Sequence, residues 1–175
     1  MSTSTDVIDM LKGGHAGQLG RAAEVKALVT ATPELFDEVM RAISSTDKVV
    51  ASRASHIVLN LAKEDKCWLE GYKQTVIQLL DSTNGFARMH SLELVSFFDY
   101  DDSELGTLLG LIDKVLFSTS NNFTNVSALQ ARVNLTVKNP WLKDETVGII
   151  EEEMQKGRAA IKARGRKLLK LLRKL

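Results

Sequence analysis

Proline and cysteine are both scarce in this sequence. Two prolines and eleven glycines in 175 residues argue against an all-β fold, which needs many turns. The single cysteine, Cys67, has no partner for an internal disulfide. A lone cysteine fits a reducing compartment, so we expect a cytoplasmic protein.

Long apolar runs and targeting signals are missing as well. The N-terminal segment MSTSTDVIDMLKGG has neither the basic start nor the apolar core of a signal peptide. The most apolar stretch, residues 105–117, is interrupted by Asp113 and Lys114. We therefore expect neither secretion nor a membrane span.

The sequence also lacks the motifs of common enzymes. It contains no G-x-S-x-G, no P-loop and no dinucleotide-binding fingerprint. The glycines of GGHAGQLG (residues 13–20) follow a helical segment, so we interpret them as a turn and a helix start. His15, His56 and His90 show no metal-ligand spacing, and Cys67 has no histidine nearby, so we expect a packed cysteine rather than a reactive thiol. We predict a protein that is not an enzyme and uses no metal or cofactor.

What the sequence does contain is helical periodicity. Apolar residues recur at the i, i+3, i+4, i+7 spacing of a helix with one buried face. Three such stripes comprise Leu35, Phe36, Val39, Met40 and Ile43; Leu69, Tyr72, Val76, Leu79 and Leu80; and Leu105, Leu108, Leu109, Ile112 and Leu116. Turn-forming residues separate the helical segments near residues 13, 44, 82, 118 and 138. The pattern predicts an all-α fold of short helices joined by short turns.

We expect these helices to form five antiparallel pairs within a single domain that covers residues 1–175. The pairs span residues 5–30, 33–63, 67–97, 102–138 and 143–174. Thr32 precedes Pro33 and is expected to cap the helix that starts there. In the acidic segment DYDDSE, we expect Asp102 or Ser103 to cap the first helix of the fourth pair.

An arginine recurs once in each pair. The five residues are separated by 32, 35, 44 and 32 positions, and they are Arg21, Arg53, Arg88, Arg132 and Arg164. At about 100° per residue, each arginine lies at the flank of the buried stripe of a second helix, where its stem can pack. We expect each guanidinium to reach the neighbouring pair.

Two segments, VVASRASHIVLNLA and AAIKARGRKLLKLL, resemble the second helices of HEAT repeats. The HEAT pattern spaces a valine-like, a basic and a small residue as V-R-x-x-A, and Ile161, Lys162 and Gly165 match it. The segment VASRA, which begins at Val50, matches it without the basic residue, and the third and fourth pairs match it poorly. The resemblance covers most of the chain.

This resemblance implies a right-handed α-α superhelix of about five helix pairs, of the armadillo/HEAT type. It implies a scaffold whose second helices line a concave binding face. The family's Asp–Arg ladder between repeats can be assigned only at Asp47, because later pairs have no aspartate at the equivalent place. Some alkylation-repair DNA glycosylases are built from similar repeats, but Asp99 and Asp144, which lie near aromatic residues, lack that family's supporting residues.

Polar residues of the second helices are the candidates for a partner-binding face. Arg53, His56 and Asn60 are three and four residues apart, so they form a polar stripe along one side of a helix. Together with Arg88 and Arg132 they make up the predicted partner-binding set. The alternative is that this stripe is a solvated helix face.

The C-terminus is strongly basic. From Lys156 onwards there are nine Lys or Arg residues and no acidic residue. An apolar stripe comprises Ile161, Gly165, Leu168, Leu172 and Leu175. The opposite stripe holds the candidate anion-binding residues Arg158, Lys162, Arg166, Lys170 and Arg173 or Lys174. This basic stripe is either the solvated cap of a terminal repeat, a site for an acidic protein or a nucleic acid, or a contact with a membrane surface.

Taken together, these patterns favour a protein-interaction scaffold or adaptor. The partner would be a protein that binds the concave face or the basic C-terminal helix. The alternative is a nucleic-acid-binding or DNA-repair-related protein of the HEAT-like class.

Overall fold

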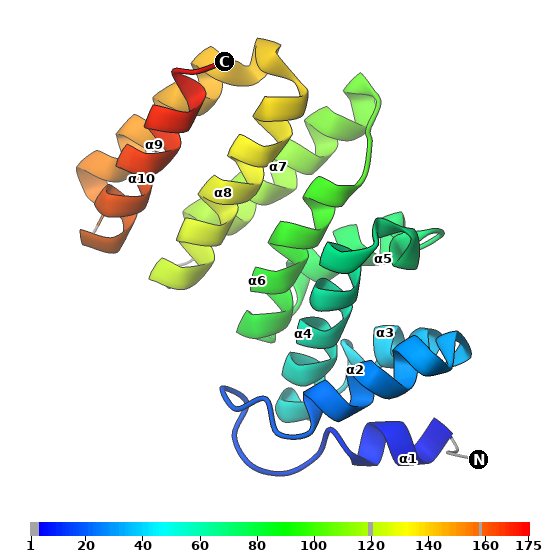
Figure 1. Cartoon of the computed structure of the whole chain (residues 1–175). Helices are drawn as coiled ribbons and strands as arrows, with labels where there is room; N and C mark the ends of the chain where they lie inside the picture. The colour runs from blue at the N-terminus through cyan, green and yellow to red at the C-terminus, as the bar shows by residue number, and fades with distance from the viewer. Residues whose placement is uncertain (1–3, 119–120, 158) are drawn as a thin grey trace. The chain divides into compact units, whose positions relative to one another are not determined.

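The computed structural model describes residues 4–118, 121–157 and 159–175, and every regular element within these ranges is a helix (Figure 1). The predicted all-α fold is confirmed. In the described ranges, no helix is both long enough and apolar enough to cross a membrane. The chain divides into two compact units, Met1–Phe97 and Phe98–Leu175, and the single domain over residues 1–175 stays a prediction.

The first unit consists of α-helices and short 3-10 helices. In chain order its α-helices are α1 (Ser4–Asp9), α2 (Ala22–Ala31), α3 (Phe36–Ala42), α4 (Lys48–Glu64), α5 (Lys73–Gln78) and α6 (Gly85–Leu94). The 3-10 helices are η1 (Pro33–Leu35), η2 (Lys66–Leu69), η3 (Leu79–Asp81) and η4 (Val95–Phe97).

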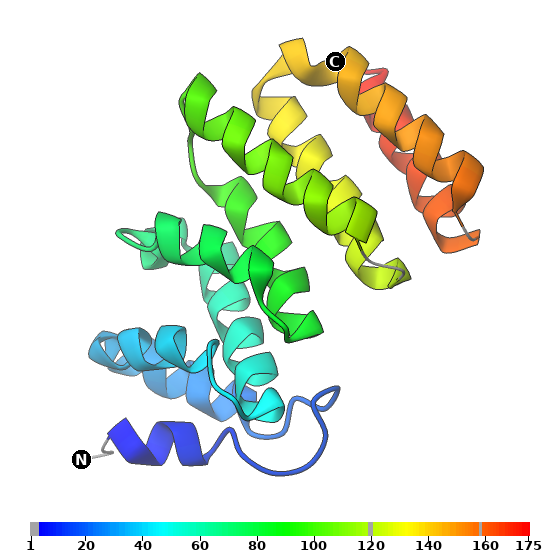
Figure 2. The same cartoon turned by 180° about the vertical axis from the view of Figure 1, so that it is seen from behind.

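Helices of the first unit pack in two layers. The second helices are in contact in the order α2, α4, α6, while α1 contacts α3 and α3 packs against α4 (Figures 1 and 2). Apolar side chains fill the space between the layers; Val39 and Val76 of the predicted stripes are buried, as are Ile57 and Leu92 of the second helices. Burial of these stripes is the main source of stability for the helix pairs, since isolated helices of this length are marginal in water.

Within the described ranges, the second unit has four α-helices, each of 14 or 17 residues. Its elements are α7 (Asp102–Ser118), α8 (Asn122–Lys138), η5 (Pro140–Leu142), α9 (Lys143–Lys156) and α10 (Ala159–Leu172). Helix α8 contacts α7, α9 and α10, and α9 packs against α10. At that contact, a Cβ atom added to Gly165 would lie 2.4 Å from the sulfur of Met154, so the glycine permits the close approach of the two helices.

The predicted two-faced character of α10 is confirmed. Four residues of its apolar stripe are buried, and they are Ile161, Gly165, Leu168 and Leu172. Leu175, which we expected in the same stripe, is 47% exposed because it lies beyond the end of the helix.

A fixed interval separates the second helices. Helices α4, α6, α8 and α10 begin at Lys48, Gly85, Asn122 and Ala159, and each start lies 37 residues after the previous one. The first three are capped alike: the side-chain Oδ1 of the preceding Asp47, Asn84 or Asn121 accepts hydrogen bonds from the two amides at the start of the helix. Such caps satisfy amides that have no partner within the helix. The three caps therefore recur at the same 37-residue interval as the helices.

This register corrects the role that we expected for the recurring arginines. Arg53, Arg88, Arg132 and Arg164 do lie in second helices, and Arg21 directly precedes α2. Counted from the cap of its own helix, however, Arg53 is six residues along, Arg88 four and Arg132 eleven. Arg53, Arg88 and Arg132 therefore do not mark equivalent positions, whereas Arg53 and Arg164 both lie five residues after the first residue of their helix.

Three expected helix-start contacts also differ. Thr32 makes no side-chain cap hydrogen bond. The cap of α7 is Asp101, whose carboxylate accepts from the Glu104 amide while Glu104 accepts from the Asp101 amide. Asp47 accepts from the amides of its own helix, so its carboxylate serves as a cap rather than as part of an inter-repeat Asp–Arg ladder.

Candidate partner-binding surfaces

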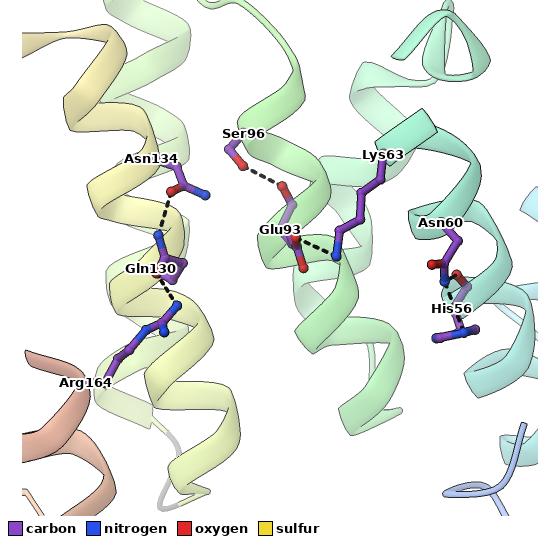
Figure 3. A network of polar contacts seen from close by, with 8 residues as sticks. All are labelled: His56, Asn60, Lys63, Glu93, Ser96, Gln130, Asn134 and Arg164. Atoms are coloured by element: carbon purple, nitrogen blue, oxygen red, sulfur yellow. Dashed lines mark hydrogen bonds and ion pairs between the residues drawn. The ribbon is translucent and has the colours of Figure 1, made fainter. Parts of the chain in front are cut away.

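Polar side chains gather where α4 and α6 lie side by side in the first unit. We call this set the α4–α6 polar face; it consists of His56, Asn60 and Lys63 from α4 and His90 and Glu93 from α6. Four of the five are half-buried, and Lys63 is exposed. Figure 3 shows the hydrogen bond and the ion pair that order this face.

Two imidazole rings meet at the centre of this face. The ring centroids of His56 and His90 are 5.8 Å apart, and the rings are tilted by 57°. The Nδ2 atom of Asn60 donates both to the carbonyl of His56 at 2.7 Å and to the Nε2 atom of His56 at 3.0 Å. The His56 ring is therefore held with Nε2 as an acceptor.

The tautomer of His90 follows from its partner, Ser55. The hydroxyl of Ser55 donates to the Ser52 carbonyl at 2.9 Å, and the same oxygen lies 2.8 Å from Nδ1 of His90. A hydroxyl has only one hydrogen to donate, so Nδ1 of His90 carries the proton. The lone pair of the neutral ring is then on Nε2.

Burial keeps both histidines uncharged at neutral pH. It lowers the pKa of His90 to about 4, with smaller contributions from His56 and Lys63. Burial also lowers the pKa of His56, together with the charges of Lys63 and Lys26. The centre of the α4–α6 polar face is thus neutral and can both donate and accept hydrogen bonds.

Charged residues on this face are paired across helices. The ammonium of Lys63 lies 2.9 Å from a carboxylate oxygen of Glu93, which joins α4 to α6. The hydroxyl of Ser96 donates to the carbonyl of Glu93 at 2.6 Å (Figure 3). These contacts leave a face that is polar but nearly balanced in charge.

A series of side-chain hydrogen bonds connects α8 and α10 in the second unit. The guanidinium of Arg164 donates to the side-chain oxygen of Gln130, whose Nε2 donates to Asn134 at 2.6 Å (Figure 3). Gln130 is the ninth residue after its helix cap, as are His56 and Glu93. The same position of the repeat therefore carries a half-buried polar side chain in α4, α6 and α8.

Arg53 is buried instead of facing a partner. Only 4% of its surface is exposed. Its Nε donates to the carbonyl of Gln18 at 2.9 Å, and its Nη1 donates to the carbonyls of Leu11 and Lys12 at 2.8 and 3.1 Å. The guanidinium ties the segment that follows α1 to α4, so it has no free surface for the partner that we expected it to bind.

The glycines of GGHAGQLG make this contact possible. The backbone of Gly20 has a φ of +52°, a left-handed conformation that favours glycine. A Cβ atom at this position would lie 2.6 Å from the central carbon of the Arg53 guanidinium. The segment is a turn, as expected, and α2 starts just after it at Ala22.

Arg88 binds the backbone just before its own helix instead of reaching the neighbouring helix pair. It is half-buried, and its Nε donates to the carbonyl of Ser82 at 2.9 Å, just before the start of α6. Part of its side chain stays exposed. Its role as a partner-binding residue remains a prediction.

Arg132 is buried within a charged network. It is 1% exposed, and its Nη1 lies 2.7 and 2.8 Å from the two carboxylate oxygens of Asp113 on α7. Its Nη2 lies 2.9 Å from Glu145 on α9, outside hydrogen-bonding geometry. Burial raises the pKa of Asp113, an effect that Arg132 opposes. Arg132 thus links three helices, and its burial removes it from the predicted binding face.

The predicted anion-binding residues of α10 stand out by their exposure. Lys162, Arg166, Lys170 and Arg173 are all exposed, and none of them forms an ion pair with another described residue. Arg158, which we assigned to the same set, lies outside the described residues. We call the four described residues the basic face of α10.

Several members of these surfaces were not singled out from the sequence. Lys63 lies three residues after Asn60 and extends the polar stripe of α4, so helical spacing alone could have identified it. Glu93 likewise lies three residues after His90. No local signal brings His56 close to His90, because the two residues are 34 positions apart.

The candidates for chemistry are dispersed. Cys67 is exposed, contrary to our expectation that it is packed, because it lies in the surface turn η2. Hydrogen bonding to Asp65 raises the pKa of its thiol, which opposes activation as a nucleophile. Asp99 pairs with Lys138, and Asp144 is exposed in the first turn of α9. No cluster of three or more His, Cys, Asp or Glu residues in the described ranges could hold a metal ion.

Comparison with known proteins does not extend this picture. No family model, no curated protein and no solved structure matches the chain. The resemblance to HEAT repeats therefore rests on the residues of this chain and on the spacing of its helices.

Proposed function

We propose that this chain is a non-enzymatic interaction module, a small HEAT-like α-solenoid that binds a protein partner through its second helices. The 37-residue spacing of α4, α6, α8 and α10 supports a right-handed superhelix of helix pairs. In such repeats each pair buries its apolar stripe against the next, and the second helices are free to form a binding face. A cytoplasmic location belongs to the same proposal.

The observation that carries the proposal is the α4–α6 polar face. Its side chains are ordered by hydrogen bonds and by a cross-helix ion pair, and its two central rings are neutral. Ordered side chains lose little conformational entropy when a partner binds. A polar, nearly balanced face suits a partner segment that offers both donors and acceptors.

The test is affinity capture with matched variants. Asn60→Arg places a bulky charge on the proposed face, whereas Gln74→Arg places the same side chain at an exposed position of α5. We expect a partner that the wild-type chain captures from its own cells to be lost with Asn60→Arg and retained with Gln74→Arg. Equal recovery with both variants would exclude the α4–α6 polar face.

A second partner class is favoured by a separate observation. The cations of the basic face of α10 have no acidic partner among the described residues. Their charge favours an anionic ligand, and this helix belongs to the other compact unit.

A further inference from the structure

The basic face of α10 occupies one side of its helix. At about 100° per residue, Lys162, Arg166, Lys170 and Arg173 fall within an arc of about 80°. The buried stripe of α10 lies on another side and is fixed against α9 by the close contact of Gly165 with Met154. The orientation of the four cations is therefore set by the packing of the second unit.

These four cations differ from most exposed cations elsewhere in the chain. Six of the others lie within 4.0 Å of a carboxylate, in the pairs Lys12–Asp9, Arg21–Glu24, Arg41–Glu38, Lys63–Glu93, Lys138–Asp99 and Lys156–Glu152. On α10 the like charges are instead spaced three or four residues apart, which destabilises a helix by a few tenths of a kcal/mol per pair. An anionic ligand would remove this repulsion.

The neighbouring helix does not supply the missing anions. Helix α9 is rich in acidic residues, but Glu152 and Glu153 lie within 4.0 Å of Lys156, and Glu145 lies 2.9 Å from Arg132. Most of the α9 carboxylates, which are the closest to α10 in sequence, thus already lie beside other cations. The positive field of α10 is directed to solvent.

The composition of this face indicates which anion fits. Residues 159–175 contain no aromatic side chain, and the exposed Leu171 lies about 140° around the helix from Arg166. The centres of protein–protein interfaces are enriched in aromatic residues and depleted in lysine, whereas interfaces with nucleic acids are polar and strongly positive. The basic face of α10, which is polar and positive and has no aromatic residue, matches the composition of nucleic-acid interfaces.

Its length also fits a phosphate backbone. Lys162 and Arg173 are eleven positions apart, which corresponds to about 16 Å along the helix axis. One strand of a nucleic-acid duplex presents a phosphate about every 3.4 Å along its axis, so up to four phosphates lie within reach. No base-reading side chain accompanies the cations, so contacts would be made with the backbone.

We infer that the basic face of α10 is a sequence-independent binding surface for the phosphate backbone of a nucleic acid. This inference does not rest on the α4–α6 polar face, which involves other helices. With four phosphate contacts, affinity should fall roughly 100-fold between about 50 and 200 mM monovalent salt.

The experiment measures fluorescence anisotropy of two labelled probes, a mixed-sequence DNA duplex of about 20 base pairs and a single-stranded RNA of similar length. The test variant carries Lys162→Glu, Arg166→Glu and Lys170→Glu. We expect it to lose affinity by roughly 100-fold or more at low salt and to keep its helical circular dichroism. The triple glutamine variant at the same positions should lose affinity to a lesser degree.

The matched control reverses three exposed cations of the first unit, Arg41, Lys48 and Lys66, and changes the net charge equally. We expect it to bind within about threefold of the wild type, because these cations belong to α3, α4 and η2 and are not part of the basic face of α10.

Three results would overturn the inference. The first is an absence of binding to either probe at low salt, and the second is an equal loss of affinity in the control variant. The third is equal competition by poly-glutamate of matched charge, which would assign the basic face to an acidic protein.

Discussion

The side chain of Asn84 joins the starts of two successive second helices. Its Nδ2 donates to the main-chain carbonyl of Lys48, the first residue of α4, at 2.9 Å. Its Oδ1 accepts from the amides of Phe86 and Ala87 at the start of α6. One amide side chain therefore caps its own helix and links it to the preceding repeat.

We predict that Asn84→Asp separates these two roles. A carboxylate can still cap α6 but cannot donate to Lys48, so the free energy of unfolding should fall by about 1 kcal/mol. Asn84→Ala loses both roles and should cost about 2 kcal/mol. Urea denaturation measures both values. Asp47→Asn, which keeps a capping oxygen, is the control and should stay within about 0.5 kcal/mol of the wild type.

The contact of Arg53 with the glycine-rich turn can be tested at Gly20. In Gly20→Ala the new Cβ would lie 2.6 Å from the Arg53 guanidinium, and the alanine would have to adopt a left-handed backbone conformation. We therefore expect the free energy of unfolding to fall by about 2 kcal/mol and hydrogen exchange in residues 11–20 to become faster. Gly13→Ala is the matched control, since Gly13 has a similar φ of +76° but open space around it. It should show only the backbone strain, about 1 kcal/mol. Equal losses in the two variants would mean that the arginine contact adds nothing.

Acid should destabilise the first unit through His90. Burial lowers the pKa of His90 to about 4 in the folded chain, below the ordinary value of 6.5, so the unfolded chain binds the proton first as the pH falls. The neutral His90 ring contributes fully to the free energy of unfolding above pH 6.5. This contribution, up to about 3 kcal/mol, is lost progressively as the pH falls to 4.

The measurement compares the wild type with His90→Asn, which keeps a donor for Ser55 but does not titrate. The difference between their free energies of unfolding should shrink as the pH is lowered from 7 to about 4.5. A difference that is independent of pH would contradict the low pKa.

The buried network of Arg132 should respond unequally to the loss of its two partners. The side chain of Asp113 is 24% exposed, and Asp113→Ala leaves a buried guanidinium without its main partner. The free energy of unfolding should therefore fall by about 3 kcal/mol. Glu145 is 62% exposed, so Glu145→Ala should cost less than about 1 kcal/mol. Thermal or urea unfolding of the two variants checks this ranking, and a larger effect at Glu145 would refute it.

Helix content and the faces of the helices are encoded locally. The apolar stripe at i, i+3, i+4 spacing identified α7 and the buried side of α10, because a helix places these residues on one face whatever surrounds it. The boundaries of the pairs were also close, since turn residues act within a few positions of the chain. The 37-residue register was visible in the same sequence, but the more conspicuous arginines obscured it.

The partner-binding set was only partly predictable. His56 and Asn60 do lie on a half-buried polar face, whereas Arg53 and Arg132, from the same list, are buried. Sequence spacing gives the direction in which a side chain leaves its helix but does not reveal what lies opposite. An arginine at the flank of an apolar stripe looks the same whether it meets solvent, a carbonyl or a carboxylate.

Tertiary structure decided these cases through contacts between distant residues. The carbonyl of Leu11 reaches Arg53 across 42 positions, and Ser55 reaches His90 across 35. The sequence by itself determined the helices, their polar and apolar sides and the excess of positive charge at the C-terminus. Packing determined which charges are buried, which histidines stay neutral and which cations remain unpaired, because burial and hydrogen bonding depend on neighbours that only folding brings together.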